Sequence, residues 1–146
     1  MTLKLVGAAC AALVLSLAPA TAAETADCGS WVTDVQFIAY PREQSIIPLS
    51  DGRITLLRIN TREPRATSKH LVVLDTIDSA LPSCTLITKV APATGFARLE
   101  LSNDPPTVLE GGALEFPFAG TDGAGQMTIY TVTIDEAAGT ITVRPE

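Results

Sequence analysis

Apolar and polar residues alternate at every second position in several short segments of this chain, and this period constrains its fold more than any other feature. The alternation is strictest in residues 127–135 and returns in residues 140–144, after a connection that contains Gly139. Because successive side chains of a β-strand point to opposite faces, we interpret the two segments as a β-hairpin. No segment keeps an apolar period of 3.6 residues over three helical turns.

One segment, residues 53–60, carries apolar residues at both sets of alternating positions. The two sets are Ile54 with Leu56, and Leu57 with Ile59. We therefore expect this strand to be buried on both faces of its sheet. The same reading predicts further strands between turn residues, at 31–40, 45–48, 71–75, 84–90, 96–102 and 113–119.

Proline places one predicted strand at a sheet edge. Pro117 lies inside the apolar pattern of 113–119, and proline has no N–H to donate within a central strand. About eight short strands in a domain of this length predict an all-β fold, either a single immunoglobulin-like sandwich or a small barrel. The Cys–Trp–Cys arrangement of immunoglobulin domains is absent, because Trp31 follows Cys28 by only three residues.

The N-terminus has the pattern of a cleavable signal peptide. Lys4 precedes an apolar run from 5 to 18, and the motif Ala20-Thr21-Ala22 supplies the small residues that signal peptidase accepts. This run is shorter than the roughly 20 residues that cross a bilayer as a helix. We therefore expect a signal peptide at 1–23 and a single β domain at 24–146, periplasmic or secreted, with no transmembrane segment in the mature chain.

The net charge disfavours a nucleic-acid partner. Without the signal peptide, nine basic residues stand against sixteen acidic ones, which gives a net charge of −7. Binding to nucleic acid needs a basic face that neutralises phosphates. The charge is also uneven, since residues 42–70 are mildly basic and residues 99–146 are strongly acidic.

Two cysteines, Cys28 and Cys84, remain after removal of the signal peptide. An even pair in an exported domain is expected to form one disulfide. A redox role would need a Cys-x-x-Cys motif or an activating base nearby, and neither cysteine has one in sequence. The sequence therefore predicts a structural bond between the N-terminus of the domain and a strand near mid-chain.

Few residues offer catalytic or metal-binding chemistry. His70 is the single histidine, which excludes metal motifs built on paired histidines. A general base would need a nucleophile and an orienting carboxylate beside it, so we expect His70 to be an exposed loop residue instead. Turn acids such as Asp135 and Glu136 are expected to cap backbone N–H groups. No metal or cofactor is predicted.

Basic side chains gather in and before a polar segment, residues 61–70, that Pro64 marks as a loop. Arginines on a loop held by a rigid sheet can clasp an anionic group. We therefore treat five residues as candidates for binding an anionic ligand, a glycan or an envelope protein: Arg58, Arg62, Arg65, Lys69 and His70. The alternative is that these charges only keep the loop soluble.

Three functional hypotheses follow. The favoured one is a non-catalytic exported β domain that binds an envelope partner as an adaptor, inhibitor or accessory protein. A small-ligand carrier would need a barrel cavity lined by residues such as Trp31, Phe37 and Tyr130. A carboxylate-dependent hydrolase would need two convergent acids in a cleft, and the sequence offers no such constellation.

The mature protein is expected to begin at Ala23 or Glu24, because the small residues that signal peptidase reads end at Ala22 or Ala23. Intact-mass measurement of exported material checks this expectation. A mass that retains residues 1–22 would contradict it.

Overall fold

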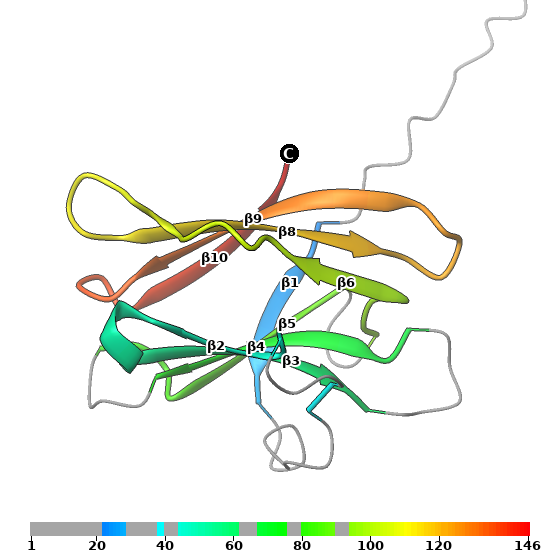
Figure 1. The fold of residues 1–146 in the computed structure, drawn as a ribbon, viewed down its shortest axis with the longest axis horizontal. Helices are drawn as coiled ribbons and strands as arrows, with labels where there is room; N and C mark the ends of the chain where they lie inside the picture. Colours follow the sequence, from blue (N-terminus) through cyan, green and yellow to red (C-terminus); the bar gives the residue numbers. More distant parts are fainter. Residues whose placement is uncertain (1–21, 29–37, 40–43, 62–66, 76–79, 90–93) are drawn as a thin grey trace, which may run out of the picture.

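The computed structural model describes residues 22–28, 38–39, 44–61, 67–75, 80–89 and 94–146. Its strands form two antiparallel sheets that pack face to face (Figure 1). The predicted all-β sandwich is therefore confirmed, and the architecture is a sandwich rather than a barrel. Among the described residues, no helix is long and apolar enough to cross a membrane.

The first sheet has five strands, and chain neighbours β2 to β5 are also neighbours in space. Across the sheet the order is β1 (Glu24–Asp27), β5 (Cys84–Thr88), β4 (Lys69–Asp75), β3 (Ile54–Asn60) and β2 (Ile46–Leu49). The predicted strand at 45–48 is thus β2 and lies at an edge. The predicted strand at 31–40 falls outside the described residues except at its end, where Ile38 bridges Ile59 of β3.

The second sheet also has five strands, and β8 lies inside it. The strands are β10 (Thr140–Pro145), β9 (Met127–Asp135), β8 (Leu114–Thr121), β6 (Arg98–Leu101) and β7 (Thr107–Val108). β9 and β10 form the predicted hairpin, with Ile141 opposite Ile134. Gly139 closes its turn with a φ of 66°, in the left-handed region that glycine adopts without strain.

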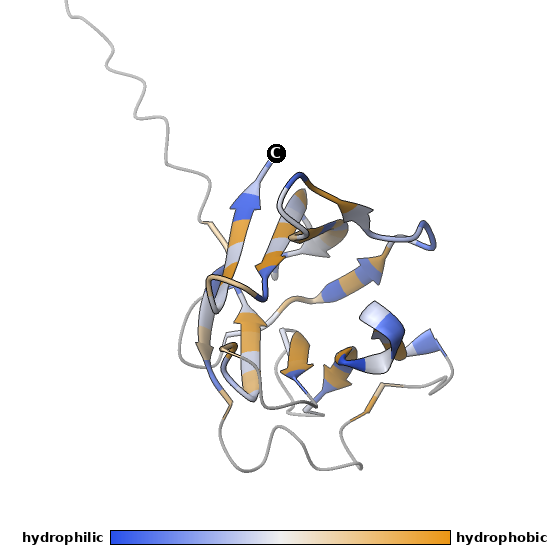
Figure 2. Ribbon diagram, turned by 90° about the vertical axis from the view of Figure 1, so that its left-hand side faces the viewer, coloured by the Kyte–Doolittle hydropathy of each residue, from blue (hydrophilic) through white to orange (hydrophobic). Residues whose placement is uncertain are grey.

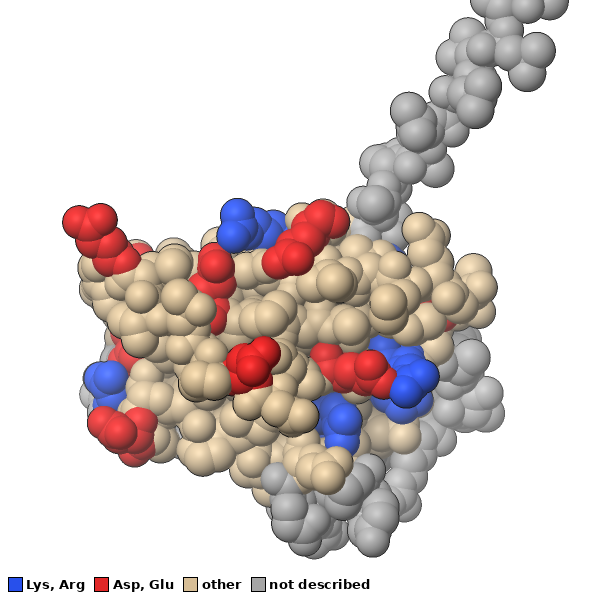
Figure 3. All heavy atoms as spheres, turned by 45° about the horizontal axis from the view of Figure 1, so that its top comes forward, with Lys and Arg blue, Asp and Glu red and all other residues tan. Residues whose placement is uncertain are grey.

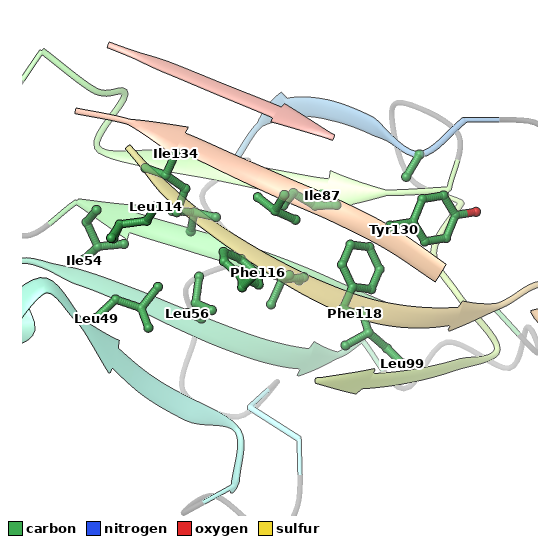
Figure 4. Packing of buried hydrophobic residues seen from close by; sticks show 14 of the residues in the cluster. Leu49, Ile54, Leu56, Ile87, Leu99, Leu114, Phe116, Phe118, Tyr130 and Ile134 are labelled. Carbon is green, nitrogen blue, oxygen red and sulfur yellow. The ribbon is translucent and has the colours of Figure 1, made fainter. Parts of the chain in front are cut away.

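The main core fills the space between the two sheets. The hydropathy pattern alternates along the strands in Figure 2, as the period of two requires. Figure 4 shows side chains of both sheets meeting in this layer: Leu49, Ile54 and Leu56 from the first, and Leu114, Phe116 and Ile134 from the second. Burial of apolar area at about 25 cal/mol per Å² makes this layer the largest stabilising contribution to the fold.

The first sheet is buried on its outer face as well. Leu57 and Ile59 of β3 form a second cluster there with Val72 and Leu86. Ile54 and Leu56, at the alternating positions of the same strand, lie in the main core. The predicted burial of residues 53–60 on both faces is therefore confirmed.

The position of Pro117 corrects one expectation. Pro117 lies in β8, which is an interior strand and pairs with β9 along its whole length. On the other side, β7 pairs with residues 114–115 and β6 with residues 118–121, so that no strand pairs with Pro117 there. Pro117 therefore lies where strand pairing is interrupted. The interruption is in the neighbouring edge strand, between β6 and β7, and β8 itself is not an edge strand.

The disulfide between Cys28 and Cys84 is present, with a Cα–Cα distance of 5.6 Å. It joins the residue after β1 to the first residue of β5, and so continues the pairing of those two strands at Asp27 and Thr85. The cysteines are 56 positions apart. Closing a loop of this length stabilises a fold by about 4 kcal/mol in the chain-entropy model.

Three aromatic rings pack at one end of the main core, around Gly120 of β8. The rings of Phe118 and Tyr130 stack at a centroid distance of 5.0 Å, and Phe96 meets both edge-on. A Cβ added at Gly120 would lie 2.6 Å from two ring atoms of Phe96. Glycine is therefore required here by close packing.

Replacing Gly120 with Ala should lower the free energy of unfolding by about 1 to 3 kcal/mol, because the new methyl group displaces the Phe96 ring from a filled core. Urea unfolding followed by tryptophan fluorescence measures the loss. Ala119→Ser is the control. It adds one atom at the preceding residue, on the outer face of the sheet, and should change the free energy of unfolding by less than about 0.5 kcal/mol. Equal stability of Gly120→Ala and wild type would contradict the packing described here.

Candidate functional site

A groove of about 740 Å³ opens on the side of the sandwich where β2 ends the first sheet and β6 and β7 end the second. Its lining includes three side chains of the main core, Leu49, Leu56 and Phe116. Ligand pockets of proteins are mostly apolar with a few polar groups. This groove has a volume within the range of such pockets, but its lining is mixed, with polar and charged side chains beside the apolar ones.

One wall of the groove exists because the edge strand of the second sheet is interrupted. β6 ends at Leu101 and β7 begins at Thr107. Between them, Pro105 and Pro106 have no N–H to donate to β8, so the chain cannot continue the ladder there. The departing segment is held by Ser102, whose hydroxyl donates to Asp104 Oδ2 at 2.9 Å and accepts from Asp104 N at 3.1 Å.

The opposite wall is β2, a short edge strand. Ile47 pairs with Leu56 of β3 and Pro48 pairs with Thr55. Pro48 also lines the groove, and proline is tolerated at an edge because no further strand requires its N–H. Both walls therefore contain prolines that leave sheet edges unpaired, which is how folded proteins limit unwanted strand pairing.

Arg58 is the one cationic side chain among the described residues that line the groove. It lies on β3 opposite Leu71, on the face that looks toward the second sheet, and its side chain is half-buried. Its Nε and Nη2 both donate to Ser45 Oγ, at 3.3 Å and 3.1 Å. Ser45 is fully buried, and its carbonyl accepts from Arg58 N at 2.8 Å. The guanidinium is thus held from one side by a fixed partner.

Two of the other candidate residues, Lys69 and His70, lie in the described chain, and neither lines the groove with Arg58. The structure places Lys69 and His70 in β4, so the predicted loop is wrong at its C-terminal end. The ammonium of Lys69 donates to the carbonyl of Ala97. Arg62 and Arg65 lie outside the described residues.

His70 is buried, with 1 % of its surface exposed, which corrects the expectation of an exposed loop histidine. It pairs with Ile59, so it faces away from the groove that Arg58 lines. Its imidazole packs against Gly95, where an added Cβ would approach two ring atoms to 2.8 Å. The imidazole therefore acts as a packing element of the outer face.

The residues proposed for a carrier cavity do not form one in the described part of the chain. Tyr130 is fully buried in the aromatic cluster, and its hydroxyl is 3.0 Å from Lys89 Nζ. Trp31 and Phe37 lie outside the described residues. The aromatic ring that contacts the groove is Phe116 instead.

Two carboxylates, Glu100 and Asp104, line the groove on the second-sheet wall. Glu100 is paired with Arg98 at 2.5 Å, and Asp104 is tied to Ser102. Both acids belong to exposed residues. A general acid of a hydrolase needs a carboxyl group in an apolar, desolvated position, so neither residue fits that role.

Of the two turn acids expected to cap backbone N–H groups, Glu136 instead accepts from Ser50 Oγ at 3.3 Å and pairs with Arg53 at 3.1 Å, which corrects that expectation. Asp135 Oδ1 accepts from the backbone N of Ala138 at 2.9 Å, which confirms the expected capping role for that residue. Within the described ranges, no group of three or more His, Cys, Asp or Glu side chains is placed to hold a metal ion. On the face shown in Figure 3, acidic and basic side chains are interspersed, so no large patch of one sign appears there.

Sequence reasoning missed most of this groove. It named Arg58, but it had no means of seeing that Ser45, Phe116 and the segment 102–106 lie around the same space. The available signal was the Asn103-Asp104-Pro105-Pro106 run. Consecutive prolines cannot donate to a ladder, so this run also indicates a break in the edge of a sheet.

Comparisons with known protein families, with curated proteins and with solved structures give no match to this chain.

Proposed function

We propose that this chain is a small exported, non-catalytic binding domain, and that its groove receives an extended peptide segment of an envelope protein. In this role the domain acts as an adaptor, inhibitor or accessory protein, in the periplasm or after secretion. Export is supported by the N-terminal pattern and by the disulfide, since disulfides persist in oxidising compartments.

The groove carries the proposal because it opens directly beside core side chains, along two strand edges. Its lining follows residues 44–49 on one wall and residues 100–106 on the other. Five steps along a strand cover about 16 Å, a span that suits a peptide of about five extended residues. Burial of the exposed parts of Ile47 and Leu101 would supply the apolar contribution to affinity.

Recognition in this groove is expected to depend on side chains rather than on strand addition. A peptide that adds a strand to a sheet needs a row of free N–H and C=O groups. Pro48 and Pro117 interrupt that row on both walls. Apolar side chains of the peptide would instead occupy the space above Leu56 and Phe116.

Selection of a displayed random octapeptide library on the immobilised mature domain tests this proposal. Gln44→Trp and Ser102→Trp each place a large ring on one wall of the groove, and each should weaken binding of the selected peptides by tenfold or more, about 1.4 kcal/mol. Thr142→Trp is the control, since Thr142 is exposed on the outer face of the second sheet.

Circular dichroism melting establishes that each tryptophan variant is folded before its binding is compared. If the selected peptides bind both groove variants as tightly as wild type, the groove is not the binding site. The same conclusion follows if only Thr142→Trp loses binding.

A further inference from the structure

Arg58 is a charged side chain at the border of the main core. On the same face of β3 it follows Ile54 and Leu56, and across the strand pair it faces Leu71. All three of these neighbours are buried in the main core. Placing a guanidinium beside such residues is costly unless it is paired and hydrogen-bonded, so Arg58 needs acceptors at this position.

Arg58 differs from the other described arginines in its ion pairing. Four arginines lie in the described ranges, and three of them bind a glutamate: Arg53 with Glu136 at 3.1 Å, Arg98 with Glu100 at 2.5 Å and Arg144 with Glu115 at 3.0 Å. Arg58 forms no ion pair with any residue that the structure describes. Its bonds go to the neutral hydroxyl of Ser45, which orients the guanidinium and leaves further N–H donors for an acceptor.

The two walls of the groove differ in charge. Arg58 lies on the first-sheet wall, while Glu100 and Asp104 lie on the second-sheet wall. A single carboxylate placed at Arg58 gains a charge-assisted, bidentate hydrogen bond. A group with more negative charge would also meet the field of Asp104 across the groove, whereas the charge of Glu100 is balanced by Arg98.

We infer that Arg58 makes the groove selective for a peptide that carries one aspartate or glutamate next to apolar residues. This inference rests on the proposed function, because it names the chemistry of the peptide that the groove receives. Ser45 is a positioning residue in this account. It fixes the guanidinium plane and does not itself need to contact the peptide.

Parallel selections of the same octapeptide library test the inference. Wild type should enrich peptides with Asp or Glu at one position, and Arg58→Gln should lose that preference while keeping the apolar one. Arg58→Glu should enrich Lys or Arg at the same position. Arg144→Gln removes an equal charge from the outer face of the second sheet and should select the same peptides as wild type.

Affinities of one selected peptide complete the test. Changing its acid to the matching amide should weaken binding to wild type about tenfold and should leave binding to Arg58→Gln unchanged, because the two changes remove the same contact. Arg58→Lys keeps the charge without the planar fork and should lie between wild type and Arg58→Gln. Thermal melting of each variant verifies that it is folded.

The outcomes separate this inference from the proposed function. If Arg58→Gln and wild type enrich the same acids, or if the amide peptide binds wild type equally well, the acid selectivity is overturned while groove binding stands. If Gln44→Trp and Ser102→Trp leave peptide binding intact, or if wild type enriches no peptide, both are overturned.

Discussion

The break in the edge of the second sheet determines most of what is distinctive in this fold. Pro105 and Pro106 cannot donate to the ladder, so β6 and β7 pair with different ends of β8 and leave residues 116–117 uncovered. Because the first sheet ends at the short strand β2 on the same side, the groove opens beside the interlayer core there. The groove is a direct consequence of strand pairing that proline prevents.

Contacts elsewhere in the molecule stabilise the two sheets that border the groove. The first sheet is buried on both faces, and the disulfide fixes its outer strand β1 to β5 at the far side from the groove. The turn between β2 and β3 is tied to the second sheet, since Ser50 Oγ donates to Glu136 Oε1 at 3.3 Å and Arg53 pairs with the same carboxylate. A binding edge on a rigid sandwich loses little conformational entropy when it receives a ligand.

The sequence predicts those features of the fold that depend on the local apolar period. It does not predict the features that depend on pairing between strands distant in sequence. The alternation of apolar residues alone determines which side chains lie on the same face of a strand. The buried faces of residues 127–135 and 53–60 could therefore be predicted. His70 was misplaced because polar neighbours look like a loop, whereas its burial arises from pairing with Ile59. Arg58 was found as one member of a basic run, but its significance comes from Ser45 and from strands that are distant in sequence.

We propose that a partner occupies the groove between β2 and the interrupted edge of the second sheet, within reach of the residues on its rim. Site-specific photocrosslinking in the cell envelope tests it most directly, with benzoylphenylalanine placed either at Asn103, on the exposed rim of the groove, or at Thr142, on the outer face of the second sheet. The account predicts one discrete adduct from Asn103 that disappears in the Ser102→Trp background, and none from Thr142. A discrete adduct from Thr142 with none from Asn103 would contradict it.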